Sequence, residues 1–428
     1  MSAPSTSAVS HVGWQRGFWC LMATQFQNAF SDNALKQLII YILLASVAVG
    51  VGASEDELKA AKNHKALLVA VVTVVFSAPF ILFAMLGGWL ADRFSKQRVM
   101  VNVKVAEIFI MAFATLALWA PGLTLKLCAI FLMGCHSAIF APSKYGILPE
   151  ILPHEKLSWG NGILELLTFI SVILGTVAAG LFRKEFKDNV WLAGLVLMAL
   201  ATIGWAFSRS ITPAPAAAPG SPVRINPVTD LWRQLSIMKQ DRDLWRACWG
   251  NTGFFFISAL IMMNVTVFGE DTLKLTDDAI GYLTVWLALG LGIGSVVAGY
   301  ASRGRIEYRL VPIGALGLAL STIPMGMEGV TAFNFSICMA TLGFSAGLFI
   351  VPVVSVIQHR PSPESKGAVQ GSVSSLSFLG IMAAAGVQWI AREAFQISSA
   401  QVFWVCGGSA LICGAYAAIS RGRFIEIE

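Results

Sequence analysis

The sequence predicts an all-α membrane protein in which twelve transmembrane helices form two six-helix bundles. Of its 428 residues, 56% are hydrophobic and only 13% are charged, whereas about a quarter of the residues in soluble domains carry a charge. A soluble protein with so few charges could not cover its surface. The apolar runs are long and do not alternate with polar residues. This favours helices over a β-barrel, because lipid offers no partner for unpaired backbone groups.

Apolar runs of about 20 residues, the length that crosses a bilayer, occur twelve times along the chain. They lie at about 17–48, 66–90, 98–120, 124–143, 161–182, 190–209, 247–269, 279–301, 308–327, 331–355, 367–391 and 400–420. The first six predict one bundle, residues 17–210, and the last six predict the other, residues 247–420. Residues 1–16 and 421–428 are expected to be cytoplasmic tails.

Residues 211–246 form the predicted cytoplasmic linker between the bundles. Its first part, "TPAPAAAPGSPVRINP" (212–227), is rich in proline and small residues, which disfavours regular structure. Its second part, "LWRQLSIMKQDRDLWR" (231–246), alternates basic and apolar residues at helical spacing. We expect this part to be either an amphipathic helix on the membrane surface or a solvated connector.

The distribution of Lys and Arg predicts the orientation of the chain in the membrane. With the N-terminus inside, the inner loops and tails hold 19 of the 30 Lys and Arg residues and the outer loops hold nine. Inner loops of membrane proteins are enriched in these residues, so both termini are expected in the cytoplasm. The net charge of +6 follows from this topology, and no nucleic-acid partner is expected.

Neither a cofactor nor a catalytic site is expected. The seven cysteines and five histidines are scattered and show no CxxC or zinc spacing. No Walker A motif is present, which argues against direct drive by ATP. The stretch "HRPSPE" (359–364) has the spacing of an acyltransferase box, but Glu364 replaces its Asp and no second signature follows. We therefore expect a protein that is not an enzyme.

The two halves of the sequence echo each other. "GGWLADRFSKQR" (87–98) has a counterpart 211 residues later, "AGYASRGRIEYR" (298–309). "FAPSKYGILPEILPHEK" (140–156) has a counterpart 210 residues later, "IVPVVSVIQHRPSPESK" (350–366). Two matches at nearly one offset indicate a six-plus-six duplication. Parallel halves joined by a central linker are the plan of one large class of transporters.

The loop after the second apolar run resembles the G-x-x-x-D-R-x-G-x-R-R loop of the major facilitator superfamily. Gly88, Asp92, Arg93 and Arg98 match it, and Ser95 replaces the second glycine. Gly88 would let two helices approach closely, and Asp92 would favour the positive end of a helix dipole. Both arginines are expected to pair with acids across a gate that opens and closes. The alternative is a positive-inside loop that happens to contain an acid.

Four further stretches resemble the bacterial lysophospholipid transporter family. They are "QFQNAFSDNALK" (25–36), "VNVKVAE" (101–107), "APSKYGILPEIL" (141–152) and "NGILELLTFISVILG" (161–175). The resemblance implies flipping of lysophospholipids, mainly lysophosphatidylethanolamine, from the outer to the inner leaflet of the bacterial cytoplasmic membrane. There an acyltransferase restores the second chain. Some relatives carry that enzyme fused at the C-terminus, and we expect a separate enzyme here because this chain ends soon after its last apolar run.

The first apolar run carries a polar stripe. Asp32 and Lys36 would each cost about 2.5–3.5 kcal/mol at a helix centre, but four residues apart they share a face and can partly neutralise each other. Asn28 and Gln25 extend this face, and Asn33 follows Asp32. One interpretation is an ion pair that stabilises helix packing. The favoured one is a cavity site, in which Asp32 binds the ammonium of a headgroup and Lys36 or another base binds its phosphate.

Other charged residues lie within or beside apolar runs. Lys104 and Glu165 are candidates for the binding site. Glu107, three residues from Lys104, is expected to pair with it and is grouped with the gate. Lys144 and Tyr145 end the fourth run, where they are expected to meet the lipid phosphate or the inner gate. The alternative is a plain interfacial anchor.

The lipid tail needs an apolar path between helices. "CWGNTGFFFISALIMMN" (248–264) offers Phe and Met side chains for that path, although ordinary core packing explains them equally. Two other functions fit the fold. One is a proton-coupled exporter of hydrophobic cations, with Asp32 or Glu165 carrying the proton. The other is a non-transporting scaffold that docks an acyltransferase.

Overall fold

The computed structural model describes residues 13–47, 54–223 and 226–418 of the chain. Within these ranges the first half forms α1 (Trp14–Ser46), α2 (Glu55–Arg93), α3 (Lys96–Trp119), α4 (Thr124–Ile151), α5 (Leu157–Glu185) and α6 (Trp191–Ser208). The second half forms α8 (Arg242–Asp271), α9 (Asp277–Ala301), α10 (Leu310–Met325), α11 (Ala332–His359), α12 (Lys366–Glu393) and α13 (Ser399–Ala418). Between the halves lies α7 (Pro227–Met238), and short 3₁₀ turns η1 (His154–Lys156) and η2 (Pro363–Ser365) precede α5 and α12.

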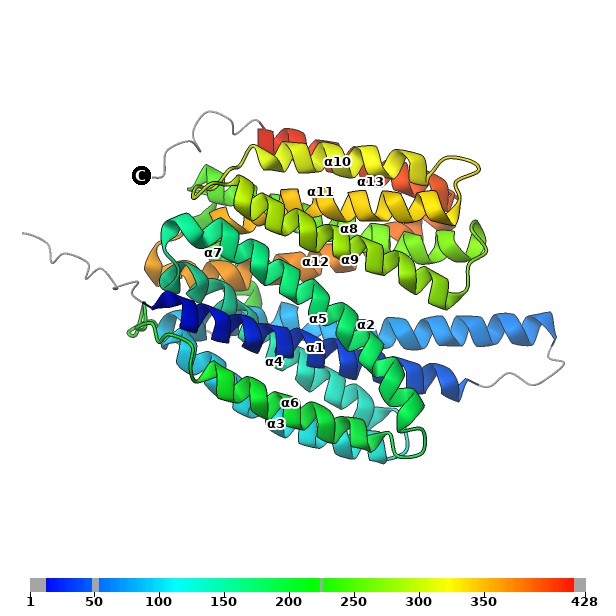
Figure 1. The fold of residues 1–428 in the computed structure, drawn as a ribbon, viewed down its shortest axis with the longest axis horizontal. Helices are drawn as coiled ribbons and strands as arrows, with labels where there is room; N and C mark the ends of the chain where they lie inside the picture. The colour runs from blue at the N-terminus through cyan, green and yellow to red at the C-terminus, as the bar shows by residue number, and fades with distance from the viewer. Residues whose placement is uncertain (1–12, 48–53, 224–225, 419–428) are drawn as a thin grey trace, which may run out of the picture.

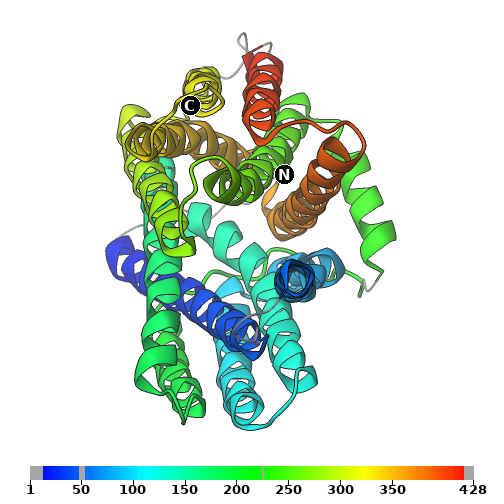
Figure 2. The same ribbon diagram turned by 90° about the vertical axis from the view of Figure 1, so that its right-hand side faces the viewer.

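The predicted fold class is confirmed: twelve long helices form two bundles of six. Figure 1 shows α1, α3, α4 and α6 in the lower part and α8, α10, α11 and α13 in the upper part, and Figure 2 shows the two groups end-on. Nine of the described helices are long and apolar enough to cross a membrane by length and composition. The other three are α1, α10 and α13. Helix α1 carries the polar stripe, which lowers its hydropathy, and α10 has only 16 residues.

The packing of the helices repeats between the halves, as the duplicated sequence predicts. In the first half α1 packs on α5, α2 on α4 and α3 on α6; in the second half α8 packs on α12, α9 on α11 and α10 on α13. The main contacts between the halves are also related by this repeat, since α2 packs on α12 and α9 packs on α5. The halves therefore meet along two equivalent seams.

The two faces of the bundle differ. The α2–α3 turn, α7, the start of α1 and the end of α13 lie on one face, at the left of Figure 1, which we call the linker side. The opposite face is called the far side. Helix α7 lies against α2 and α12, so it touches both halves. Its residues Val228 and Trp232 lie one turn apart and are exposed.

The expected linker helix at 231–246 is two helices in the structure. Helix α7 ends at Met238, and α8 begins at Arg242 because the Asp241 side chain accepts hydrogen bonds from the next turn and caps it. Arg360, at the end of α11, binds both carboxylate oxygens of Asp241 at 3.0 and 3.1 Å. Partial burial would raise the pKa of Asp241, but the hydrogen bonds from Arg360 and the backbone outweigh it and hold this pKa below its usual range.

Candidate functional site

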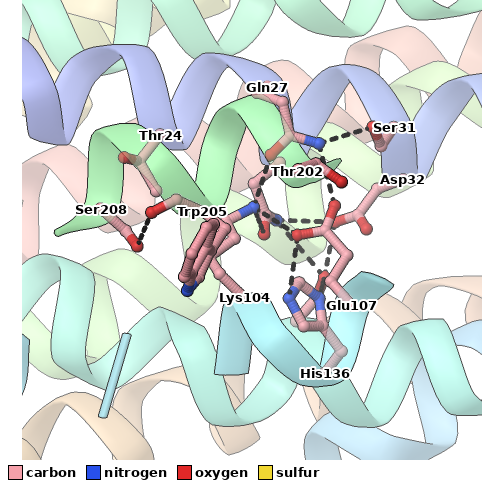
Figure 3. Close-up of polar contacts among 12 residues, drawn as sticks. Thr24, Gln27, Ser31, Asp32, Lys104, Glu107, His136, Thr202, Trp205 and Ser208 are labelled. Atoms are coloured by element: carbon pink, nitrogen blue, oxygen red, sulfur yellow. Dashed lines mark hydrogen bonds and ion pairs between the residues drawn. The ribbon is translucent and has the colours of Figure 1, made fainter. Parts of the chain in front are cut away.

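A buried polar network occupies the first bundle, with Lys104 of α3 at its centre (Figure 3). The Lys104 side chain is fully buried, and its Nζ donates to Gln27 Oε1 at 2.8 Å, Asn28 Oδ1 at 2.9 Å and Glu107 Oε2 at 2.5 Å. The expected pairing of Lys104 with Glu107 is confirmed. Because an ammonium has three donors and all three have acceptors, Lys104 holds α1 and α3 together and has no free donor for a ligand.

Glu107 belongs to the same network. Its Oε1 accepts a hydrogen bond from Gln27 Nε2 at 2.9 Å, and its Oε2 lies 3.4 Å from His136 Nε2 of α4. These partners all belong to the first half of the chain. The expectation that Glu107 acts in the gate is therefore corrected: its carboxylate is sealed inside one bundle and touches no group across the seam among the described residues.

Asp32 lies at the edge of this network. Its Oδ2 accepts hydrogen bonds from Ser137 Oγ at 2.6 Å and Asn28 Nδ2 at 3.1 Å. Its Oδ1 is buried and has no hydrogen-bond partner within the described ranges. Only 8% of the residue is exposed. One oxygen of Asp32 is thus fixed by its neighbours, and the other is buried without a hydrogen-bond partner in the described ranges.

The alternative interpretation, an ion pair between Asp32 and Lys36, is not found among the residues that the structure describes. Lys36 Nζ lies 5.0 Å from the centre of the Phe76 ring on α2, a cation–π contact, and no ion pair joins it to Asp32 in the described part of the chain. Asn33 donates to the backbone oxygen of Ala29 of its own helix and lies outside the network. Ser137 and Asn28 already hold Asp32, so the Lys36 stem is free to reach the aromatic ring.

A second polar group joins α4 and α5. Tyr145 Oη donates to Glu165 Oε1 at 3.3 Å, and Lys144 Nζ lies 4.2 Å from the centre of the Tyr145 ring. Lys144 and Glu165 are both buried. Gln25 of α1 reaches the same helix, donating to Thr168 Oγ1 at 3.1 Å. The structure therefore brings together three candidates that the sequence placed in two separate stretches.

An apolar cavity of about 650 Å³ lies between the two halves. It is lined mainly by α5, α8, α9 and α11, with Tyr41 from the far-side part of α1 and single residues of α10 and α13, namely Leu318, Ala410 and Cys413. Phe169 lines it and lies one turn along α5 from Glu165, so the polar group lies about one helical turn from the cavity wall. Phe254, Phe255 and Met262 of the stretch 248–264 line it too. The cavity can hold an apolar chain whose polar end points toward Glu165.

The linker side is closed between the halves by backbone and side-chain contacts. Both carboxylate oxygens of Asp92 accept hydrogen bonds from backbone amides at the start of α12, Gly367 at 2.6 Å and Ala368 at 2.8 Å. A Cβ on Gly88 would clash with the Gly367 carbonyl oxygen. Asp92 thus lies at a helix N-terminus and Gly88 at a close approach, as their residue types indicated.

A second closure lies at the other seam. Asn161 of α5 and Gln358 of α11 exchange two amide hydrogen bonds, both 2.9 Å, and Asn161 also donates to Ser355 Oγ at 3.0 Å. All three residues are buried. Sequence reasoning missed this pair, because neither half alone shows which amide its partner half presents.

The expected pairing of Arg93 and Arg98 with acids across the gate is not found among the described residues. Arg93 donates to the Ser221 backbone oxygen at 2.5 Å and stacks on Trp89. Arg98 is exposed and forms no hydrogen bond or ion pair in these ranges. The acids nearby are already engaged, since Asp92 caps α12 and Glu150 pairs with Lys96.

Sequence reasoning also missed Gln27, Ser137 and His136. All three are polar residues inside apolar runs, and this alone could have marked them as candidates for a buried polar site. His136 was considered only as a metal ligand, and the histidine spacing does not fit one. In the described part of the chain no group of three or more His, Cys, Asp or Glu residues is placed to hold a metal ion.

We expect Asp92→Asn to open the linker side more often. The asparagine amide has only one oxygen, so it cannot accept from the two backbone N–H groups as the two carboxylate oxygens do. It also carries no charge to interact with the α12 dipole. Together these changes should weaken the closed state by about 1–2 kcal/mol. A cysteine at Ser372, which is buried against Met85, should then react roughly 5–30 times faster with a water-soluble maleimide. The parent protein without the Ser372→Cys change gives the background from the native cysteines.

The matched control is Glu364→Gln, which removes an exposed carboxylate beside the same helix. Labelling at Ser372→Cys should not change in that variant. Equal labelling in the Asp92→Asn and Glu364→Gln backgrounds would show that the Asp92 contact does not hold the gate.

Comparison with other proteins gives consistent matches over most of the chain. A family model described as Major Facilitator Superfamily matches residues 21–385. The lysophospholipid transporter LplT of Enterobacter sp. (strain 638) is 28% identical over 356 residues, covering 81% of each chain. LplT of Salmonella typhimurium is 28% identical over 377 residues, covering 86% of this chain and 85% of that protein.

The fold is shared with a solved structure as well. The crystal structure of the human organic anion transporter MFSD10 matches with a TM-score of 0.77 at 16% identity, covering 95% of this chain and 99% of that chain. At that identity the likeness concerns the arrangement of helices alone.

Proposed function

The chain belongs to the major facilitator superfamily, and from that premise we propose that it carries lysophospholipids from the outer to the inner leaflet of a bacterial cytoplasmic membrane. The observation that carries the proposal is the apolar cavity between the halves, with the buried group of Glu165, Tyr145 and Lys144 about one helical turn from its wall at Phe169. A lysophospholipid has one long tail and one polar headgroup, and this cavity offers a place for each. The relatives named as lysophospholipid transporters support the same substrate class.

The tail would occupy the cavity lined by α5, α8, α9 and α11. Exposing the tail to water would cost about 0.8 kcal/mol for each CH₂ group, so an apolar lining avoids this cost while the lipid moves between the leaflets. The headgroup would lie toward Glu165, Lys144 and Asp32. The unpartnered oxygen of Asp32 suits an ammonium, and Lys144 suits a phosphate. Lys104 and Glu107 position Asn28, and through it Asp32.

The linker side would face the cytoplasm, in agreement with the bias of Lys and Arg toward that side. This structure would then be closed to the cytoplasm, with the cavity toward the outer leaflet. Transport requires both linker-side closures, at Asp92 and at Asn161, to break while contacts form on the far side. Such contacts are suited to switching, because hydrogen bonds between the halves can be exchanged for water. A separate cytoplasmic acyltransferase would consume the product.

The direct test is flipping in proteoliposomes. We expect wild-type protein to move fluorescent lysophosphatidylethanolamine between leaflets, measured by its accessibility to a membrane-impermeant quencher. Unlabelled lysophosphatidylethanolamine should compete, and a cationic dye such as ethidium should not. Competition by the dye together with collapse on removing a proton gradient would instead identify a hydrophobic-cation exporter. Flipping no faster than in empty liposomes would contradict the proposal.

A further inference from the structure

A second cavity, of about 770 Å³, lies on the linker side away from the seams between the halves. One wall is the end of α2, the α2–α3 turn and the start of α3. The other wall is a proline-rich segment of the linker, Pro213–Pro219, which we call the strap. The lining includes Arg93, Arg98 and Asn102 from the first wall and Pro213, Pro215 and Pro219 from the strap.

The strap is fixed in place at both ends, so the cavity is a built feature. Ala218 N donates to the Asp92 backbone oxygen at 2.7 Å, and Arg93 Nη1 donates to the Ser221 backbone oxygen. At its other end Ile211 is buried in the core of the first bundle. Three prolines keep the strap extended and remove backbone donors from it. Polar binding inside the cavity therefore depends on the α2–α3 wall.

That wall is positively charged. Two guanidinium groups, Arg93 and Arg98, line the cavity, and among the described residues no carboxylate lines it. Arg98 forms no hydrogen bond or ion pair within the described ranges. Arg93 donates one hydrogen bond to Ser221, just after the strap, and has further N–H donors. Asn102, also exposed, adds an amide donor. A planar guanidinium fork matches the oxygens of a phosphate.

The cavity includes Asn102 and Val103 of α3, a helix long and apolar enough to cross a membrane. Along the same face of α3, Asn102 is followed by Val105, Phe109 and Leu116, which are all exposed; Phe109 is 70% exposed. In a chain that spans a membrane such a face contacts lipid tails. A ligand with its phosphate at Arg98 can therefore lay acyl chains along this face.

We propose that this cavity binds the phosphate of an anionic phospholipid from the leaflet on the linker side. The charge of the wall selects the ligand. A phosphatidylglycerol headgroup brings only negative charge to the two arginines, whereas the ammonium of phosphatidylethanolamine finds no acid in the lining. The site is separate from the cavity between the halves and does not depend on the transported substrate.

Lipid retention by the full chain tests this site without a transport assay. Delipidated protein in detergent is titrated with phosphatidylglycerol, phosphatidylethanolamine or phosphatidylcholine, and bound lipid is counted by native mass spectrometry. We expect one phosphatidylglycerol to be retained more tightly than either zwitterionic lipid. Arg98→Gln should weaken that retention roughly tenfold through the lost charged hydrogen bonds, and Arg98→Lys should fall between.

The matched control is Arg305→Gln, which removes an exposed arginine from the equivalent loop of the second half. It should bind phosphatidylglycerol like wild type, and unchanged melting temperatures would show that all variants are folded. Equal retention by the Arg98→Gln and Arg305→Gln variants would overturn the proposal. Equal binding of phosphatidylethanolamine, or displacement of phosphatidylglycerol by inorganic phosphate at the same concentration, would overturn it too.

Discussion

Replacement of Lys104 by methionine is expected to lower the free energy of unfolding by about 3–5 kcal/mol. Methionine matches the length of the lysine stem, so packing changes little. The loss is electrostatic, because the Glu107 carboxylate would stay buried without its cation and the oxygens of Gln27 and Asn28 would lose their donor. The change would be measured by reversible unfolding in mixed detergent micelles, followed by tryptophan fluorescence.

The double variant Lys104→Met, Glu107→Gln separates charge from shape. Removing both charges leaves no buried ion uncompensated, so the double variant should recover a large part of the loss. Lys184→Met is the control, since Lys184 is exposed at the end of α5 and should change stability by less than about 0.5 kcal/mol. If the Lys104 and Lys184 variants lose equal stability, the network does not hold the first bundle together.

Much of the architecture follows from the sequence because a membrane permits few folds. Long apolar runs must be helices, and the repeat at an offset of about 210 residues implies that both halves pack alike. The pairing of Lys104 with Glu107 was also predictable, because residues three apart share a helix face. Each of these inferences depends on spacing along one helix or on comparison of the two halves.

The tertiary partners were not predictable in the same way. Asp32 is held by Ser137, which is 105 residues away, rather than by Lys36 one turn away. Spacing shows that two residues can meet, but it does not show which competing partner a neighbouring helix presents. The contact of Asp92 was easier to predict, because a carboxylate is stabilised at any helix N-terminus. The contacts of Arg93 and Arg98 were harder to predict. Arg93 binds a backbone oxygen of the linker, and Arg98 is exposed.

Replacement of Asp32 by asparagine is expected to slow flipping of lysophosphatidylethanolamine roughly ten- to hundredfold. The asparagine keeps the size of the side chain and can still bond Ser137 and Asn28, but it offers no charge to the substrate ammonium. A hydrogen bond to a charged group is worth about 1.5–3 kcal/mol, which corresponds to this range of rates. Initial rates in proteoliposomes with equal amounts of folded protein give the measurement.

Substrate choice shows whether Asp32 contacts the ammonium or only supports the helices. Lysophosphatidylglycerol has no ammonium, so its flipping should be much less affected by Asp32→Asn. Asn33→Ala on the same helix is the control; because Asn33 bonds only its own helix among the described residues, both substrates should keep rates within about twofold. An equal loss for both lysolipids in Asp32→Asn would mean that the charge of Asp32 supports the first bundle and does not contact the substrate ammonium. The headgroup would then have to be recognised by Glu165 and Lys144 instead.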